Sequence, residues 1–400
     1  MAGTPDMAAP PDAGSGSANN LAITACDPTD LASAVSQTLV PVEGSVGEIR
    51  TASTPSGGVV AAWVSSPDTI HLTVLDGSGG RLQPDLTVQG NNLIGLTATP
   101  DSYSMLVGDF TPTTNSYIGT IRLVRVDATS GAVLLNQTLL GGCDLSTVGC
   151  EAPLESYAGY GRLIWTGEKY AAYFATQKHL AKQVGTHQGD ALRFLDWNGT
   201  LLTGGWDYWI GGAGLDHSLD QRLAFNGSQV GALAWSDCNP QRGVIYNGWV
   251  LVSGTGDSSY CGSGSTRYYL GSLVPSADGF WFSYTTNNQR ASSDVGITHI
   301  NNAGAVISQD WLTSTSDNET DPHLAAFGGG FLSGWTLGYL APVFLARLDS
   351  NGNRVGAPQQ ISASFEAGQD WVTFSNGDVG WVTNSAWGGG LNFVRVHACN

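Results

Sequence analysis

One stretch in the middle of the chain gathers side chains that could carry out acid–base or metal chemistry. The segments HQGD and LDHSLDQR supply His187, Asp190, His217 and Arg222. Two histidines and a carboxylate can hold a divalent metal with open positions, and a histidine beside a carboxylate can act as a general base. We therefore predict His187, Asp190 and His217 as candidate metal ligands. Together with Arg222 they are also the candidate catalytic residues. The alternative is that these residues are polar scaffolding of loops and that no cofactor is required.

Basic side chains are scarce, yet several align at one position of an internal repeat that is described below. The chain has 16 Lys and Arg against 33 Asp and Glu, which gives a formal net charge of −17. The aligned residues include Arg50, Arg162, Arg222, His323 and Trp371. Converging guanidinium groups suit carboxylate, sulfate or phosphate, because their planar fork binds such groups in a bidentate manner. We predict that these residues bind a ligand. The alternative is that each arginine pairs with an acidic neighbour, such as Asp220, and joins adjacent repeats.

A long loop and an aromatic connection extend this candidate binding region. The predicted loop ATQKHLAKQVGTHQGD (175–190) contains Lys178 and His179, which would add cations. The connection that follows contains Trp206 and Tyr208, whose rings could stack on the face of a sugar. We predict that all four residues bind ligand. For the two aromatic residues the alternative is a lid over the groove between two repeats.

The elements that must position these residues repeat about every 45 to 50 residues, a period typical of propellers and solenoids. Each copy has an inner strand, a turn with glycine, a second strand that ends on an aromatic residue, and a third strand before another glycine turn. Clear copies are GRLIWTGEKYAAYF (161–174), QRLAFNGSQVGALAW (221–235) and PHLAAFGGGFLSGW (322–335). The pattern predicts an all-β fold, a seven-bladed β-propeller over residues 26–400, after a linker or tether at residues 1–25.

The second-strand aromatics recur in six copies, which predicts that they form the core between blades. These residues are Trp63, Tyr173, Trp235, Tyr284, Trp335 and Trp381.

The two ends of the repeat array are complementary. The segment SQTLVPVEG (36–44) is similar to the outer strands of other copies, whereas the last copy ends at VRVHACN, after its third strand. An N-terminal strand that completes the last blade would close the ring and remove both exposed edges. Closure would bring Cys26 beside Cys399, so we predict a disulfide between them. The next most economical pairs are Cys143–Cys150 and Cys238–Cys261.

Composition indicates an extracytoplasmic protein: secreted, periplasmic or surface-tethered. The six cysteines form no CxxC or zinc spacing, as expected for disulfides in an oxidising compartment. The first 25 residues lack the basic and apolar regions of a signal peptide, so we expect a mature exported chain. Their Pro/Ala/Asp-rich composition resembles the tether of many bacterial surface lipoproteins. The blade pattern also resembles the β-propeller repeats of such lipoproteins over nearly the whole chain, which implies a cell-surface location.

Several function classes are excluded by charge and motif. The acidic balance disfavours binding to nucleic acid, and no apolar run is long enough to span a membrane. The sequence contains no nucleophile elbow, HExxH, phosphate loop or dinucleotide fingerprint. The runs SDNETDP and DSNGN are rich in oxygen ligands and could hold Ca²⁺, but such sequences also suit turns.

The sequence thus predicts an exported, monomeric propeller that binds an anionic small molecule or a glycan. The pocket would be a single one at the channel mouth, centred on blades 3 and 4, because the unusual polar residues concentrate there. The first alternative is an enzyme on the same face, such as a lyase that acts on a uronate polymer with arginine and histidine, or a metal-dependent enzyme. The second alternative is a structural or partner-binding surface protein.

Overall fold

The computed structural model describes most of the chain between residues 30 and 398. The described residues are 30–65, 68–112, 117–141, 146–153, 161–179, 186–209, 218–236, 242–245, 251–253, 268–287, 290–338, 342–385 and 389–398.

The described strands pair into seven antiparallel sheets, each built largely from strands that follow one another along the chain. The first sheet contains β2 (Ile49–Ser53), β3 (Val59–Ser65), β4 (Thr69–Leu75) and β5 (Leu86–Gln89). The second contains β6 (Asn92–Ala98), β7 (Ser102–Pro112), β8 (Tyr117–Asp127) and β9 (Val133–Gly141). The third contains β10 (Glu151–Pro153), β11 (Gly161–Trp165), β12 (Tyr170–His179), β13 (Thr186–Leu195) and β14 (Trp206–Trp209). The fourth sheet contains β15 (Ser218–Phe225), β16 (Val230–Ser236), β17 (Arg242–Ile245) and β18 (Leu251–Ser253). The fifth contains β19 (Tyr268–Ser276), β20 (Gly279–Thr286), β21 (Asp294–Asn301) and β22 (Val306–Trp311). The sixth contains β23 (Glu319–Phe327), β24 (Gly330–Leu337), β25 (Val343–Leu348) and β26 (Arg354–Ile361). The last sheet joins β27 (Val372–Thr373), β28 (Val379–Asn384) and β29 (Gly390–Val396) to β1 (Val35–Pro41).

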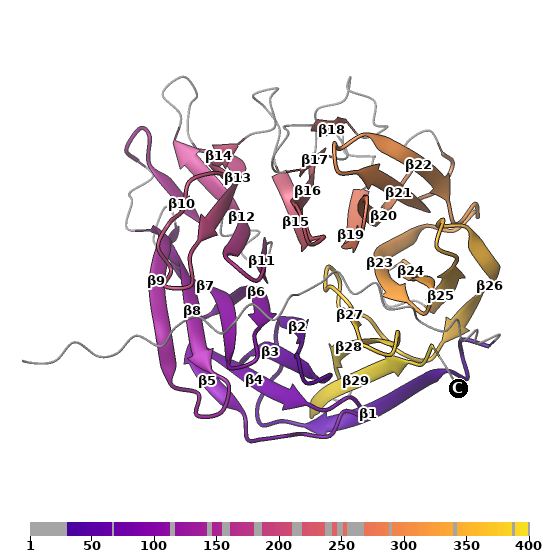
Figure 1. Cartoon of the computed structure of the whole chain (residues 1–400), viewed down its shortest axis with the longest axis horizontal. Coiled ribbons are helices and arrows are strands. Elements are labelled where there is room, and N and C mark those ends of the chain that lie inside the picture. The colour runs from indigo at the N-terminus through magenta and orange to yellow at the C-terminus, as the bar shows by residue number, and fades with distance from the viewer. Residues whose placement is uncertain are drawn as a thin grey trace, which may run out of the picture.

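The sheets stand side by side around a common centre, in chain order (Figure 1). The strand of each sheet nearest the centre is β2, β6, β11, β15, β19, β23 or β27. This arrangement is a β-propeller, so the all-β propeller predicted from the repeat is confirmed.

The last sheet is completed by the N-terminal strand. Strand β1 pairs antiparallel with β29, with Val35 opposite Val396 and Pro41 opposite Gly390. The pairing gives this sheet the order β1-β29-β28-β27. The segment that we expected to complete the last repeat therefore does so, and the outer edge of β29 is covered.

The second-strand aromatics are buried between neighbouring sheets, as the repeat predicted. Trp63, Tyr173, Tyr284, Trp335 and Trp381 are each at most 2% exposed. Burial of such a ring contributes roughly 2–3 kcal/mol to folding. The side chain of Trp235 lies outside the described part of the structure.

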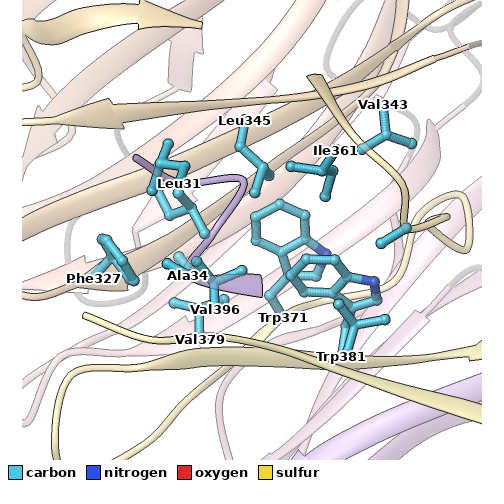
Figure 2. Packing of buried hydrophobic residues seen from close by; sticks show 14 of the residues in the cluster. Leu31, Ala34, Phe327, Val343, Leu345, Ile361, Trp371, Val379, Trp381 and Val396 are labelled. Carbon is cyan, nitrogen blue, oxygen red and sulfur yellow. The ribbon is translucent and has the colours of Figure 1, made fainter. Parts of the chain in front are cut away.

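The core between the last two sheets also holds the chain segment that leads into β1. Leu31 and Ala34 are buried in the same cluster as Trp371 and Trp381 (Figure 2). The two tryptophan rings stack with their centroids 4.5 Å apart. Closure of the ring is therefore stabilised by apolar packing as well as by strand pairing.

The predicted loop at 175–190 is largely a strand hairpin, which corrects our expectation. Strands β12 and β13 continue their pairing as far as His179 and Thr186, and β10 pairs with the other edge of β12. The backbone groups of this segment are thus satisfied by a ribbon of strands. Likewise Trp206 lies in β14 and not in an irregular connection.

The described residues include no helix that is long and apolar enough to cross a membrane.

Cys150 is the one cysteine among the described residues, where it is buried and disulfide-bonded. The predicted pairs Cys26–Cys399 and Cys238–Cys261, and the partner Cys143, lie outside the described residues.

Candidate functional site

A large cavity follows the axis of the propeller. Its volume is about 1460 Å³, and each of the innermost strands β2, β6, β11, β15, β19, β23 and β27 contributes to its wall. Arg50, Arg162, Asp370 and Trp371 line one end, which we call the channel floor. From there the cavity extends toward the turns after the innermost strands, for example residues 275–277. We had predicted a mouth at the starts of these strands, where Arg50, Arg162 and Trp371 lie, and that mouth stays a prediction.

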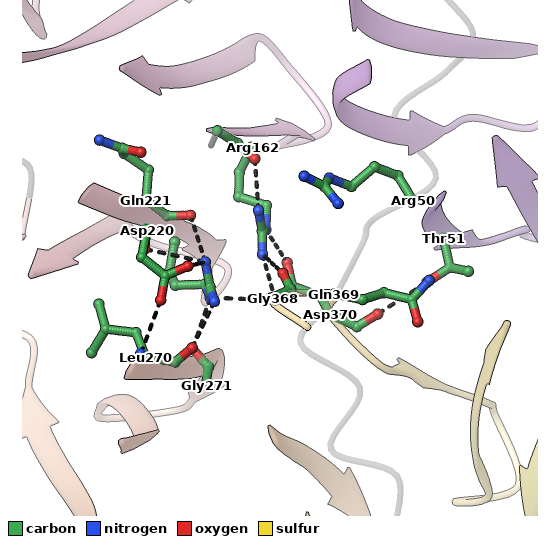
Figure 3. A network of polar contacts seen from close by, with 12 residues as sticks. Arg50, Thr51, Arg162, Asp220, Gln221, Leu270, Gly271, Gly368, Gln369 and Asp370 are labelled. Carbon is green, nitrogen blue, oxygen red and sulfur yellow. Dashed lines mark hydrogen bonds and ion pairs between the residues drawn. The ribbon is translucent and has the colours of Figure 1, made fainter. Parts of the chain in front are cut away.

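Asp370 is the central acceptor of the channel floor. Its carboxylate accepts hydrogen bonds from Nε and Nη2 of Arg162, and its backbone carbonyl accepts one from Thr51 Oγ1 at 3.0 Å (Figure 3). Nε of Arg222 lies 4.0 Å from Asp370 Oδ1. Burial by itself would raise the pKa of Asp370, but Arg162 and Arg222 outweigh it and hold that pKa below its usual value. Asp370 is therefore an ionised partner for both arginines.

Arg162 also fixes the connection between β26 and β27 across the channel. Its Nη2 donates to the carbonyl of Gly368, and its Nη1 donates to the carbonyl of Gly161 at 2.7 Å. Gly368 has φ of +70°, a left-handed conformation that favours glycine. This glycine lets the connection turn so that Gly368 and Asp370 both meet Arg162.

Arg50 lies on the same floor with a carboxylate partner of its own. Its Nη2 is 2.5 Å from Glu48 Oε1, and its Nη1 donates to the carbonyl of Ile49 at 3.1 Å. Burial is the main reason that the pKa of Arg50 is lowered. Each arginine of the channel floor is therefore matched by an acid.

Arg222 is a cross-link between β15 and β19. Its guanidinium donates to the carbonyls of Leu270 and Gly271 at 2.6 and 2.9 Å, and its Nη1 lies 2.5 Å from Asp220 Oδ1. Nη1 also donates to the carbonyls of Asp220 and Gln221. The side chain is almost fully buried and is absent from the cavity wall. This geometry matches the alternative in which an arginine joins adjacent repeats.

Two bulges aim Arg222 and His323 toward the axis. The ladder of β15 shifts between Leu219 and Arg222, and that of β23 shifts between Thr320 and His323. Asp220 and Asp321 in these bulges have φ of 58° and 49°, a conformation that Asp tolerates better than most residues. An extra residue bends a strand and re-aims the side chain that follows it.

His323 and Trp371 form a stacked pair beside the floor. Their ring centroids are 4.9 Å apart with an interplanar angle of 2°, and His323 Nδ1 lies 3.0 Å from the carbonyl oxygen of Gln369. Burial and then Arg222 lower the pKa of His323 to about 3, so the ring is neutral at physiological pH. His323 Nε2, Trp371 Nε1 and the side-chain amide of Gln369 have no hydrogen-bond partner among the described residues. A polar ligand that supplied hydrogen bonds to these buried groups would therefore lower the free energy of the site.

Asp190 anchors two aromatic side chains away from the cavity. Its carboxylate accepts hydrogen bonds from Tyr173 Oη and Trp206 Nε1, each at 2.7 Å, and it is fully buried. Burial and the carboxylate of Asp190 raise the pKa of Tyr173 well above its usual value. Lys178 and His179, at the end of β12, are likewise absent from the cavity wall. The structure therefore does not bring the predicted site residues Asp190, Trp206, Lys178 and His179 to the channel floor.

The side chains of the remaining predicted site residues, His187, Tyr208 and His217, lie outside the described part of the structure. The backbone of His187 pairs with Lys178, and Tyr208 lies in β14, but both side chains are outside the described part. His217 is also outside the described residues. Within the described ranges no group of three or more His, Cys, Asp or Glu residues could hold a metal. The predicted metal site at His187, Asp190 and His217 therefore stays a prediction.

Oxygen atoms of the two predicted calcium segments accept hydrogen bonds from backbone amides. Asp349 Oδ1 accepts hydrogen bonds from the backbone amides of Asn351 and Asn353, both at 2.9 Å. Asn318 Oδ1 accepts one from the amide of Ser293 at 2.9 Å. These contacts are those that Asx turns and loop caps require.

Sequence reasoning missed Asp370, Glu48 and Gln369. Each lies one or two residues from a position that the repeat alignment had placed at the channel. An alignment that carried two neighbouring positions from each repeat would have brought Asp370 to the same ring as Arg162.

No protein-family model matches the chain, and no curated protein sequence matches it. Many solved structures do. A periplasmic gluconolactonase from Pseudomonas aeruginosa is 11% identical and has a TM-score of 0.50 over 79% of this chain and 85% of that chain. An oligogalacturonate lyase from Vibrio parahaemolyticus is 11% identical, with a TM-score of 0.49 over 91% of this chain and 97% of that chain.

The β-propeller domain of Cps50 from Myceliophteria thermophila is 9% identical, with a TM-score of 0.46 over 90% of this chain and 98% of that chain. At 11% identity the likeness to the gluconolactonase concerns the fold alone and says nothing about activity.

Proposed function

We propose that this protein is a binding module whose central cavity takes a polyhydroxylated, sugar-containing ligand. The observation that carries the proposal is the pairing of charges on the channel floor. Arg50 is matched by Glu48, and Arg162 by Asp370. A floor of this kind offers donors and acceptors side by side, which suits hydroxyl groups. A free anion is less well served, because it would have to compete with the carboxylates already present.

The rest of the cavity supports a ligand of this class. Trp165 is half-buried in its wall and could present aromatic surface to a sugar, whereas the ring of Trp371 is stacked on both His323 and Trp381. Trp371 Nε1 has no partner among the described residues. The volume of about 1460 Å³ exceeds the usual range for small-molecule pockets, so we expect more than one sugar unit to fit.

A lyase remains the alternative, with less support from the described residues. Such an enzyme needs a cation to neutralise a uronate and a base to remove a proton. The donors of Arg222 are engaged by backbone carbonyls and Asp220, and a histidine with the low pKa of His323 holds a proton poorly. The other candidate bases, His187 and His217, have no described side chain.

We also propose that the seven sheets are the seven blades of a closed propeller and that the protein is extracytoplasmic, of the surface-lipoprotein type. The pairing of β1 with β29 supports a closed ring. The disulfide at Cys150 supports an oxidising compartment. The other predicted disulfides and the monomeric state are part of the same proposal.

A blocking substitution tests the ligand site with little effect on folding. Ala277 is an exposed turn residue that lines the cavity, whereas Ala303 is an exposed turn residue that does not. We expect maltotriose, chitotriose or trigalacturonate to bind the wild-type protein in calorimetric titrations. Ala277→Trp should weaken that binding at least tenfold, and Ala303→Trp should leave it unchanged. Binding of sulfate alone, or no binding of any saccharide in a broad panel, would overturn the proposal.

A further inference from the structure

A second cavity lies between two neighbouring sheets, away from the axis. Its volume is about 700 Å³, and its wall comes from the sheets β19–β22 and β23–β26 with their connections. Trp311, Trp335, Leu337 and Phe344 supply apolar and aromatic surface. This size is within the range of sites that bind small molecules.

Glu319 gives this cavity an unsatisfied acceptor. It is the first residue of β23, lines the cavity and has a fully buried side chain. Its Oε1 accepts a hydrogen bond from Thr315 Oγ1 at 2.8 Å, whereas Oε2 has no partner among the described residues. A buried carboxylate oxygen without a donor is costly, so the site gains free energy from any group that supplies one.

The charges around Glu319 do not compensate it. Asp294 and Asp317 are the charged neighbours that act on it, and both oppose its ionisation. Arg290 in the same wall donates through Nε to Asp294 Oδ2, so its charge is already matched. Arg354 donates through Nη1 to the carbonyl of Leu312 at 2.7 Å. The missing element beside Glu319 is therefore a positive charge that carries N–H groups.

The aromatic walls favour the same kind of ligand. Aromatic faces attract cations through the ring quadrupole, and the attraction is stronger where water is excluded. The protein uses this effect in the same wall, where the guanidinium carbon of Arg290 lies 4.3 Å from the ring centroid of Trp311. Trp335 and Phe344 stack with centroids 6.3 Å apart and leave an aromatic surface near Glu319.

We propose that this cavity is a binding site for a primary organic ammonium ion. The ammonium group donates a hydrogen bond to Glu319 Oε2, and the carbon skeleton packs against Trp311, Trp335 and Phe344. A hydroxyl group would supply the hydrogen bond but not the charge. A quaternary ammonium would supply the charge but not the hydrogen bond. The site is separate from the channel floor and does not depend on the function proposed for it.

Matched ligands test each part of this proposal on the full chain. Calorimetry and tryptophan fluorescence should show binding of benzylammonium or n-butylammonium chloride. The neutral isostere benzyl alcohol and the quaternary benzyltrimethylammonium should bind at least tenfold more weakly. Failure of both primary amines to bind, or equal binding of benzyl alcohol, would overturn the site, and a response to CaCl₂ in place of the amines would do the same.

Variants locate the site. Glu319→Gln keeps the shape and the bond from Thr315 but removes the charge, so it should weaken amine binding at least tenfold. Glu168→Gln makes the same change at an exposed residue on the wall of the axial cavity and should have no effect. Ser314→Trp, at an exposed residue of the cavity wall, should block binding without touching Glu319. Unchanged binding in Glu319→Gln and Ser314→Trp would place the amine elsewhere and refute the proposal.

Discussion

Asp370 on the channel floor is partly buried and Glu319 in the second cavity is fully buried, and their pKa values shift in opposite directions. Burial would raise both. Around Asp370, Arg162 and Arg222 outweigh it and the pKa is lowered. Around Glu319, burial dominates, Asp294 and Asp317 add to it, and the pKa is raised. The difference teaches that Asp370 has cationic partners on the channel floor, whereas the charges that act on Glu319 in the second cavity are acidic.

The chain topology explains this contrast. The connection between β26 and β27 places Asp370 on the channel floor, where Arg162 of β11 donates to its carboxylate and Arg222 of β15 lies 4.0 Å away. Glu319 begins an innermost strand, but its neighbours are Thr315 and Asp317 of the β22–β23 connection and Asp294 of β21. Convergence at the axis thus supplies partners that a groove between two sheets does not.

The largest effect is expected where a paired charge is broken. Arg222→Met removes the donors to Leu270 and Gly271 and leaves Asp220 as a buried acid without its cation. We expect a loss of about 3–5 kcal/mol in the free energy of unfolding, measured by urea denaturation. Arg354→Met, at an exposed arginine with one bond to Leu312, should cost less than about 1 kcal/mol. Similar losses in the two variants would mean that the network around Arg222 contributes little.

A smaller effect, with a defined pH dependence, is expected at Asp370. Its folded-state pKa lies below the usual 3.8, so its contribution is present above that pH and is lost as pH falls through the folded value. Asp370→Asn should therefore destabilise the protein by about 1–2 kcal/mol at pH 7, because a charged hydrogen bond to Arg162 is weakened. The difference from wild type should shrink in titrations below pH 4. A difference that grows on acidification would contradict the pairing.

The smallest effect, of opposite sign, is expected at Glu319. Its folded-state pKa lies above the usual 4.5, so wild-type stability falls as pH rises from 4.5 through the folded value. Glu319→Gln should lack this decrease and should be as stable as wild type at pH 7, or more stable by up to about 1 kcal/mol. Denaturant titrations at pH 4 and pH 7 give the comparison. A clear destabilisation at pH 7 would show that the carboxylate has a cationic partner after all.

Much of the fold could be predicted, because the same pattern of buried positions recurs in each copy of the repeat. The aromatic residue at the end of each second strand, such as Trp63 or Trp381, must fill the space between sheets wherever the repeat occurs. Closure was also predictable, since the similarity of residues 36–44 to outer strands and the short last repeat point to one solution.

The site was less predictable, because it depends on contacts between distant residues. Alignment brought Arg50, Arg162 and Trp371 to one ring, and all three line the cavity. The alignment could not show that Arg222 donates its hydrogen bonds to backbone carbonyls of the next sheet. Nor could it show that Asp370 is the carboxylate that pairs with Arg162. Asp190 was predicted as a catalytic residue or metal ligand because the sequence does not show its two hydrogen-bond donors, Tyr173 and Trp206, which lie 17 and 16 residues away along the chain.

The pairing of β1 with β29 means that the last sheet can be completed only after almost all of the propeller strands have been synthesised. Ser36 and His397, whose side chains are 3.0 Å apart, are separated by 361 residues. Contacts of such long range pay the full cost of loop closure and form slowly. On the ribosome β1 must wait, unpaired and with an open edge, until β29 has emerged. Until then β1 is exposed to wrong strand pairing, and a partner that covers it would protect it.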